Sequence, residues 1–271
     1  MTKTINLWKN GEYEYPCAGD FLPNITAYLH EDKQVRPAMI VVPGGGYAMV
    51  SPTEGEIVAK KFYHAGYQAF VLTYTTNMFR VKALDKQPLK DISRAVRYIR
   101  KYAEELMIKN NLVVCCGFSA GAHLVGSLAV HYQDEELKSE PYGEISNRPD
   151  AVLLSYPVIT TGKYAHGDSF ELLLGQEPTE EQLTWASNNF GEESLYTMMQ
   201  QWQTLKTLYE QNPAMITDVF VSSAKAETLL EFVAEWSKAT ADFQQQEQQK
   251  ADASVSQWPA MAIAWLSKIG K

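Results

Sequence analysis

The feature that most constrains the fold is an apolar run that leads into Gly117-Phe118-Ser119-Ala120-Gly121 and then into a segment rich in alanine and leucine. The run, residues 112–116, predicts a buried strand, and residues 120–131 predict a helix. A serine between two glycines at such a junction is typical of a sharp strand-to-helix turn, because glycine relieves the crowding of a strained backbone. The pattern therefore predicts a hydroxyl held at the carboxyl end of a strand.

The same alternation of strand and helix runs through the rest of the first 160 residues. Apolar runs predict further strands at 38–42, 68–74 and 151–156, and helical spacing of apolar residues predicts helices at 54–65 and 89–106. Strands that are apolar throughout and are separated by helices indicate a parallel sheet covered on both faces. We therefore predict an α/β fold with a mostly parallel sheet, whose functional groups lie at the carboxyl ends of the strands.

The amino-acid composition and charge exclude some classes of protein for this chain. The chain has 271 residues, 45% of them hydrophobic, which is enough for one large core, and we expect a single domain over 1–271. A net charge of −8 argues against a nucleic-acid or anionic-membrane partner. No apolar run reaches the ~18 residues that a membrane-spanning helix needs, and the first residues lack the apolar core of a signal peptide. We expect a cytoplasmic protein.

The three cysteines have neither the spacing of a zinc site nor that of a redox pair. Cys115 and Cys116 are neighbours in a predicted strand, where successive side chains point to opposite faces, so they are poorly placed to bond each other. We expect them to be small buried residues, as suits a reducing compartment.

A glycine triplet follows the strand predicted at 38–42, in the sequence Pro43-Gly44-Gly45-Gly46. It lacks the lysine and the serine or threonine of a phosphate-binding P-loop, and it lacks the spacing of a dinucleotide loop. Backbone N–H groups after an early strand can instead stabilise the negative oxygen that forms when a serine attacks an ester. We predict that Ser119 is such a nucleophile and that the N–H groups of Gly45, Gly46 and Ala120 form its oxyanion hole.

On these motifs the chain resembles the acetyl-esterase and acetyl-xylan-esterase-like branch of the α/β-hydrolase family, close to small bacterial carboxylesterases. The resemblance covers about residues 38–175 and 256–269. It is carried by Val42-Pro43-Gly44-Gly45-Gly46-Tyr47, Arg94-Ala95-Val96-Arg97-Tyr98-Ile99-Arg100, Gly117 to Leu124, Ser155-Tyr156-Pro157-Val158-Ile159-Thr160 and Ser256-Gln257-Trp258-Pro259. It implies hydrolysis of short acyl esters, often acetyl groups on sugars or small alcohols, without a metal or organic cofactor, and it also suggests a homo-oligomer.

One part of the chain departs from the family. A serine nucleophile needs a histidine base and an acid, which follow in the order Ser, Asp or Glu, His in this fold. All five histidines lie before residue 167, and residues 192–269 contain no glycine for the loop that carries the family's histidine. Residues 192–255 are predicted to be an atypically helical segment. Asp218 is the candidate acid if the apolar run at 214–221 forms a strand that ends at Thr217.

Two of the five histidines are candidate substitutes for the missing base. His123 lies one helical turn beyond Ser119, so it is expected to point away from the elbow as a buried structural residue. His166 follows the strand that ends near Tyr156, and it either reaches the catalytic face of the sheet or is a surface residue.

Two functions therefore remain open. The first is a serine-dependent hydrolase of acetyl-type carboxylic esters, which acts on a small-molecule ester. The second is a catalytically impaired hydrolase-like scaffold or binding protein that lacks the triad histidine. Nothing in the sequence favours a third, purely structural role.

Overall fold

The computed structural model describes residues 2–9, 11–16, 21–138, 142–158, 161, 165–187 and 263. The helices and strands named here all belong to one compact unit, residues 1–161 and 165–188. In chain order they are β1 (Thr2–Asn6), β2 (Asn24–Tyr28), β3 (Arg36–Val42), α1 (Glu56–His64), β4 (Gln68–Thr73), α2 (Gln87–Lys101), β5 (Ile108–Phe118), α3 (Ala120–His131), α4 (Glu135–Lys138), β6 (Ala151–Ser155), α5 (Gly167–Leu174) and α6 (Glu180–Ala186).

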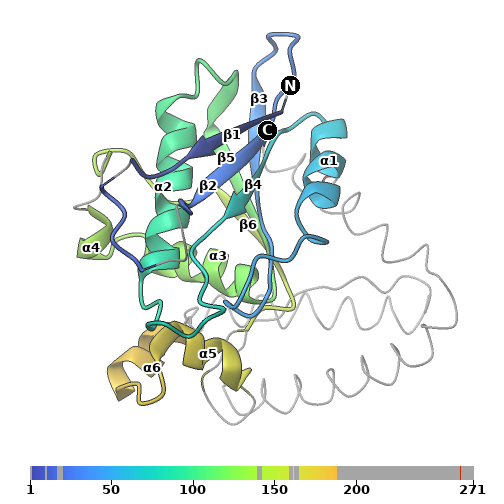
Figure 1. Ribbon diagram of the computed structural model, residues 1–271. Helices are drawn as coiled ribbons and strands as arrows, with labels where there is room; N and C mark the ends of the chain where they lie inside the picture. The colour runs from blue at the N-terminus through green and yellow to red at the C-terminus, as the bar shows by residue number, and fades with distance from the viewer. Residues whose placement is uncertain are drawn as a thin grey trace, which may run out of the picture. The chain divides into compact units, whose positions relative to one another are not determined.

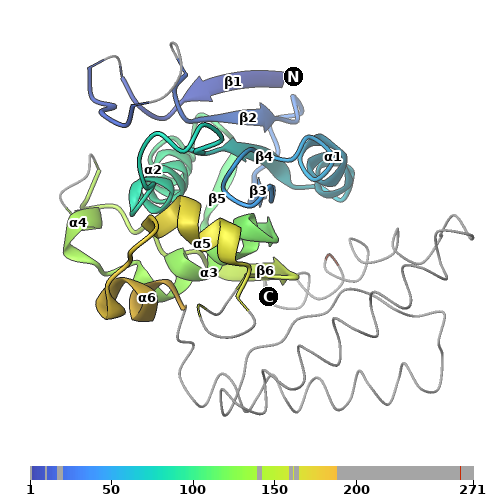
Figure 2. The ribbon, with the colours of Figure 1, turned by 60° about the horizontal axis from the view of Figure 1, so that its bottom comes forward.

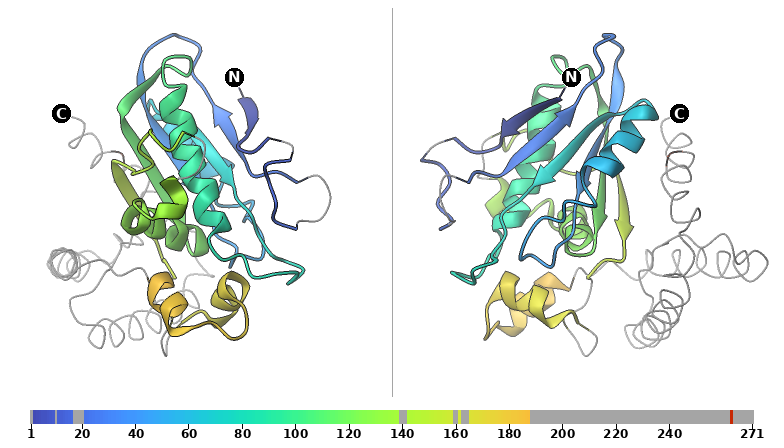
Figure 3. Two further views of the ribbon diagram at one scale, coloured as in Figure 1. Left: turned by 90° about the vertical axis from the view of Figure 1, so that its left-hand side faces the viewer. Right: turned by 45° about the vertical axis from the view of Figure 1, so that its right-hand side comes forward.

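The strands of the described residues form one sheet in the order β1-β2-β4-β3-β5-β6 (Figure 1). Strands β4, β3, β5 and β6 are parallel, and β2 joins β4 antiparallel, as β1 joins β2. Helices α2 and α3 cover one face of the sheet and α1 covers the other (Figures 2 and 3). Helices α5 and α6 lie beyond the carboxyl ends of the parallel strands.

The central strands are buried along most of their length because helices cover both of their faces. Residues 38–42 of β3 and residues 113–116 of β5 are fully buried. The four strands and three helices predicted from apolar runs and helical spacing are all present, but α2 ends at Lys101 and not near residue 106 as predicted. Strands β1 and β2 were not predicted, since β1 buries only Ile5 and β2 alternates buried and half-buried residues over just five positions.

Cys115 and Cys116 are free and buried, as predicted. Burial raises the pKa of the Cys115 thiol to about 12, and it raises that of Cys116 further. Both therefore remain protonated and unreactive at neutral pH. Among the described residues no helix is long and apolar enough to cross a membrane.

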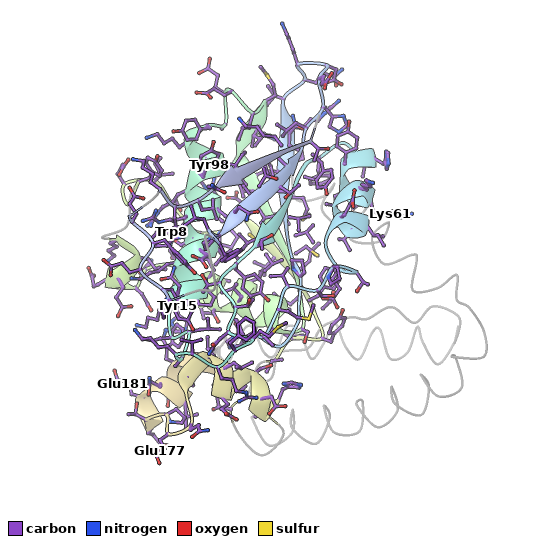
Figure 4. All side chains as sticks on the ribbon, in the orientation of Figure 1. Trp8, Tyr15, Lys61, Tyr98, Glu177 and Glu181 are labelled. Atoms are coloured by element: carbon purple, nitrogen blue, oxygen red, sulfur yellow. The ribbon has the colours of Figure 1, made fainter. Side chains whose placement is uncertain are left out.

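The N-terminal segment is attached to α2 through a buried carboxylate. The indole N–H of Trp8, which lies beside α2 (Figure 4), donates to Asp91 Oδ1 at 2.8 Å, and Thr75 donates its N–H and its hydroxyl to Oδ2. Burial raises the pKa of Asp91 to about 6 despite these donors. The guanidinium of Arg94 stacks on the Trp8 ring at 3.4 Å. The segment that follows the edge strand β1 is thus held to α2 by hydrogen bonds to Asp91 and by the stacking of Arg94 on Trp8.

Several predictions fall outside the described residues. They are the strand at 214–221 with Asp218, the helical segment at 192–255 and, apart from residue 263, the closing stretch at 256–269. The prediction of a single domain over 1–271 also depends on those residues and stays a prediction.

Candidate active site

Ser119 lies at the turn between β5 and α3 in a strained backbone conformation. Its φ of 51° and ψ of −119° lie in a region that residues other than glycine rarely adopt. Its N–H donates to Ser155 O at 2.9 Å, and its carbonyl accepts the N–H of His123 at 3.0 Å. Strain of this kind persists only when the surroundings determine it, and it is concentrated at functional sites. The predicted elbow is therefore present, with Ser119 half-buried at its tip.

The two glycines of the elbow are required by close backbone packing. A Cβ added to Gly117 would lie 2.5 Å from the Cα of Ala122, and one added to Gly121 would lie 2.2 Å from the carbonyl oxygen of Val42. No side chain fits at such distances from backbone atoms. The predicted relief of crowding at these two glycines is thus confirmed. At Gly121 the missing side chain also allows the close approach of β3.

The glycine loop, Pro43–Gly46, lies directly against the elbow. Strands β3 and β5 are neighbours in register, with Val42 opposite Gly117, so the chain segments that leave them meet. A Cβ on Gly44 would lie 2.9 Å from the Cβ of Ser119. Gly45 and Gly46 have φ values of 121° and 62°, which favour glycine.

The three predicted donors are unpaired. Within the described part of the chain, the N–H groups of Gly45, Gly46 and Ala120 have no hydrogen-bond acceptor. By contrast, the N–H of Gly44 donates to the carboxylate of Glu54 at 2.7 Å. Unpaired N–H groups beside a hydroxyl are suited to stabilising a negative oxygen that forms during the reaction.

Ser119 opens into a cavity of about 590 Å³ at the carboxyl ends of the parallel strands. The glycine loop, the turn after it and the start of α5 supply most of the wall. The lining residues are Gly45, Gly46, Ala48, Met49, Ser51, Glu54, Arg80, Ser119, Tyr156, His166, Asp168 and Leu172. The structure therefore brings together Ser119, Gly45 and Gly46, which the sequence predicted, and adds polar groups that it did not single out.

All five histidines lie in described residues, and of these only His166 lines the cavity. Its Nδ1 lies 2.8 Å from the hydroxyl of Ser169, a buried residue one turn into α5. A Cβ on Gly46 would lie 4.0 Å from its Cε1. Among the described residues the Ser119 hydroxyl has no hydrogen-bond partner. His166, which contacts Ser169, does not hydrogen-bond to that hydroxyl.

His123 is structural, as predicted. It is buried, its Nε2 donates to Ala186 O at 2.7 Å, and its Nδ1 accepts the hydroxyl of Tyr47 at 2.6 Å. Burial lowers the pKa of His123 to about 4, so the ring is neutral at pH 7. Because both ring nitrogens are occupied, His123 is not available as a base for Ser119.

Sequence reasoning missed Glu54 and gave Tyr156 no role. The Tyr156 hydroxyl donates to Glu54 Oε1 at 2.6 Å, although the two residues are far apart in the chain. The sequence carries no signal for this contact, since Glu54 looks like an ordinary acidic residue before a helix. Asp218, the candidate acid, lies outside the described residues.

Comparison with known proteins agrees with this geometry. A family model described as BD-FAE matches residues 26–218. The chain belongs to the BD-FAE family. It is 32% identical to an acetyl ester-xyloside bifunctional hydrolase from Caldicellulosiruptor lactoaceticus, whose crystal structure superposes with a TM-score of 0.62 over 69% of this chain and 68% of that one. The predicted α/β-hydrolase fold and the resemblance to acetyl esterases are thereby confirmed.

Two curated relatives of this BD-FAE chain are longer proteins. It is 53% identical to endo-1,4-beta-xylanase B of Butyrivibrio fibrisolvens over 67% of its own length and 29% of that protein. It is 33% identical to an acetylxylan esterase of Xylanibacter ruminicola over 64% of its own length and 31% of that protein. The chain thus spans less than a third of the curated relatives that it matches.

Proposed function

We propose that this chain hydrolyses short-chain carboxylic esters of the acetyl type, with Ser119 as the nucleophile and the N–H groups of Gly45, Gly46 and Ala120 as the oxyanion hole. The observation that carries the proposal is the strained Ser119 turn, which shares one cavity with Gly45 and Gly46, together with N–H groups of Gly45, Gly46 and Ala120 that have no acceptor among the described residues. Membership of the BD-FAE family supports the same chemistry.

The reaction follows from these groups. The Ser119 oxygen attacks the ester carbonyl carbon, its proton passes to a base, and the carbonyl oxygen takes up negative charge opposite the free N–H groups. The carbon–oxygen bond to the alcohol then breaks, and the alcohol leaves with a proton. Water cleaves the acyl-enzyme by the same steps in a second stage, which regenerates the Ser119 hydroxyl and releases the acid.

We assign His166 as the candidate base because it is the histidine that shares the cavity with Ser119. Hydrogen bonds of catalytic groups often shorten only when substrate binds, so a longer separation in the free chain is compatible with this role. His166→Gln is expected to lower kcat about a hundredfold or more and to be partly rescued by added imidazole. Activity equal to the parent would remove His166 from the mechanism. Asp218 stays the predicted acid.

The proposed substrates are acetylated sugars. The support is the similarity to an acetylxylan esterase and to an acetyl ester-xyloside hydrolase. The rim of the cavity also carries polar side chains suited to sugar hydroxyls, among them Arg80, Asp168 and Tyr156. Acetate release from acetylated xylo-oligosaccharides, compared with release from a simple alkyl acetate, tests this assignment.

The direct test of the proposal compares hydrolysis of p-nitrophenyl acetate by the parent and by Ser119→Ala. The loss of the nucleophile is expected to reduce kcat/KM by about 10³-fold or more. Equal rates in the two proteins would refute the proposal.

The second candidate is a binding scaffold that has lost turnover. It is favoured by the absence of a histidine within hydrogen-bond distance of the Ser119 hydroxyl in the described residues. Losing the base costs orders of magnitude in rate and leaves only what binding and the oxyanion hole supply. Rapid labelling of Ser119 by a fluorophosphonate near neutral pH supports the hydrolase, whereas no labelling over hours supports the scaffold.

A further inference from the structure

Glu54 joins three segments at the edge of the cavity. It is half-buried just before α1, and its Oε2 accepts the N–H of Gly44 at 2.7 Å. Its Oε1 accepts the hydroxyl of Tyr156, which follows β6, at 2.6 Å. Both side-chain oxygens of Glu54 thus accept a hydrogen bond, one from the backbone of the glycine loop and one from Tyr156.

Glu54 holds the first of three successive peptide groups in the glycine loop. In the first group, the Pro43 carbonyl accepts the Tyr74 hydroxyl at 2.9 Å, and the Gly44 N–H donates to Glu54. Both ends of this group are therefore held, so its plane cannot rotate.

The next two peptide groups are held at their carbonyl ends only. The Gly44 carbonyl accepts the N–H of Ser51 at 2.9 Å, and the Gly45 carbonyl accepts those of Ala48 at 3.0 Å and Met49 at 3.2 Å. Since a trans peptide directs its N–H opposite to its carbonyl, these contacts fix the directions of the Gly45 and Gly46 N–H groups and leave them unpaired. Because Gly45 and Gly46 have positive φ and no side chains of their own, the anchored Gly44 peptide group fixes where this turn begins.

We propose that Glu54 is the positioning residue that anchors the Gly44 peptide group, where the turn bearing the Gly45 and Gly46 N–H groups begins, and that it couples this turn to Tyr156 at the cavity rim. The inference rests on the proposed function, in which those N–H groups face the oxyanion. It assigns Glu54 no proton transfer, because both of its oxygens already accept hydrogen bonds.

Glutamine distinguishes positioning from proton transfer. The amide oxygen of Glu54→Gln can still accept the Gly44 N–H, and its NH₂ can donate to the oxygen of Tyr156, since a hydroxyl both donates and accepts. Glu54→Gln therefore keeps both contacts without the charge. Glu54→Ala loses both contacts.

The experiment measures steady-state hydrolysis of p-nitrophenyl acetate by the full chain and its variants. Glu54→Ala is expected to lower kcat about ten- to a hundredfold with KM nearly unchanged, because misdirected donors weaken transition-state binding. Glu54→Gln is expected to stay within about fivefold of the parent, since it retains both hydrogen bonds. The matched control is Glu56→Ala, which removes an exposed glutamate of α1 paired with Lys60 and should change nothing.

A second readout follows hydrogen exchange at the Gly44 amide in the same variants. Protection is expected in the parent and in Glu54→Gln, and its loss is expected in Glu54→Ala.

If Ser119→Ala keeps the parent rate, the proposed function fails, while hydrogen exchange still tests the contact between Glu54 and the Gly44 N–H. If Ser119→Ala is inactive but Glu54→Ala matches the parent, only the positioning inference is overturned. A rate for Glu54→Gln as low as that for Glu54→Ala also overturns it, in favour of proton transfer.

Discussion

The elbow at Ser119 and the glycine loop beside it are both closely packed against backbone atoms, but the loop is also anchored by hydrogen bonds to the side chains of Tyr74 and Glu54. At the elbow, Gly117 and Gly121 leave no room for a Cβ against neighbouring backbone atoms. In the loop, Gly45 and Gly46 have positive φ, and the hydroxyl of Tyr74 and the carboxylate of Glu54 hold the peptide group before them.

The two kinds of restraint respond differently to substitution. Backbone packing has no adjustable part, so a misfit at the elbow must displace a strand. A hydrogen-bonded loop can lose one contact and keep the others, since each is worth about 1 kcal/mol net. Substitution of a packed glycine is therefore expected to be disruptive in either region, whereas loss of one side-chain hydrogen bond is expected to weaken the loop only gradually.

The largest effect is expected for Gly121→Ala. The new Cβ would lie 2.2 Å from the Val42 carbonyl oxygen and 2.4 Å from that of Pro43, so β3 or α3 must move. We expect a loss of about 4 kcal/mol in the free energy of unfolding, or no folded protein. Urea denaturation measures it. Gly167→Ala is the matched control, because nothing lies within 4 Å of its added Cβ. Equal stability of the two variants would contradict packing as the restraint.

The next effect concerns His123, which joins the two regions through Tyr47. Its pKa is lowered from 6.5 to about 4, so between these values the unfolded chain binds a proton that the folded chain does not. Stability is therefore lost as the pH falls from 6.5 towards 4, by up to about 3 kcal/mol from this residue. Urea titrations of the parent and of His123→Gln at several pH values check this. The variant should show a shallower pH dependence, and identical slopes would disprove the assignment.

The smallest effect is expected for Tyr74→Phe, which removes one contact of the loop. The ring stays buried, but the Pro43 carbonyl loses its donor, at a cost of about 1–2 kcal/mol. Thermal or urea denaturation detects it. Tyr63→Phe serves as control, since the Tyr63 hydroxyl has no partner among the described residues. A loss above that of Gly121→Ala would reverse the comparison.

The same contrast accounts for what the sequence predicted and what it did not. The elbow could be predicted because strand, turn and helix are contiguous, and the packing around Gly117 follows from that local order. The hydrogen bonds from Gly44 and Tyr156 to Glu54 join three segments that are separate in the sequence. No local sequence pattern at these residues indicates the contacts. Strand β1 was missed for a related reason, because its place in the sheet depends on β2 and not on its own apolar content.

The most direct measurement is a crystal structure of the chain after reaction with a short alkyl fluorophosphonate. We expect one adduct, on the Ser119 oxygen, with a phosphonyl oxygen about 2.7–3.1 Å from the N–H groups of Gly45, Gly46 and Ala120. An adduct on another residue, or a phosphonyl oxygen on Ser119 directed away from those N–H groups, would contradict it.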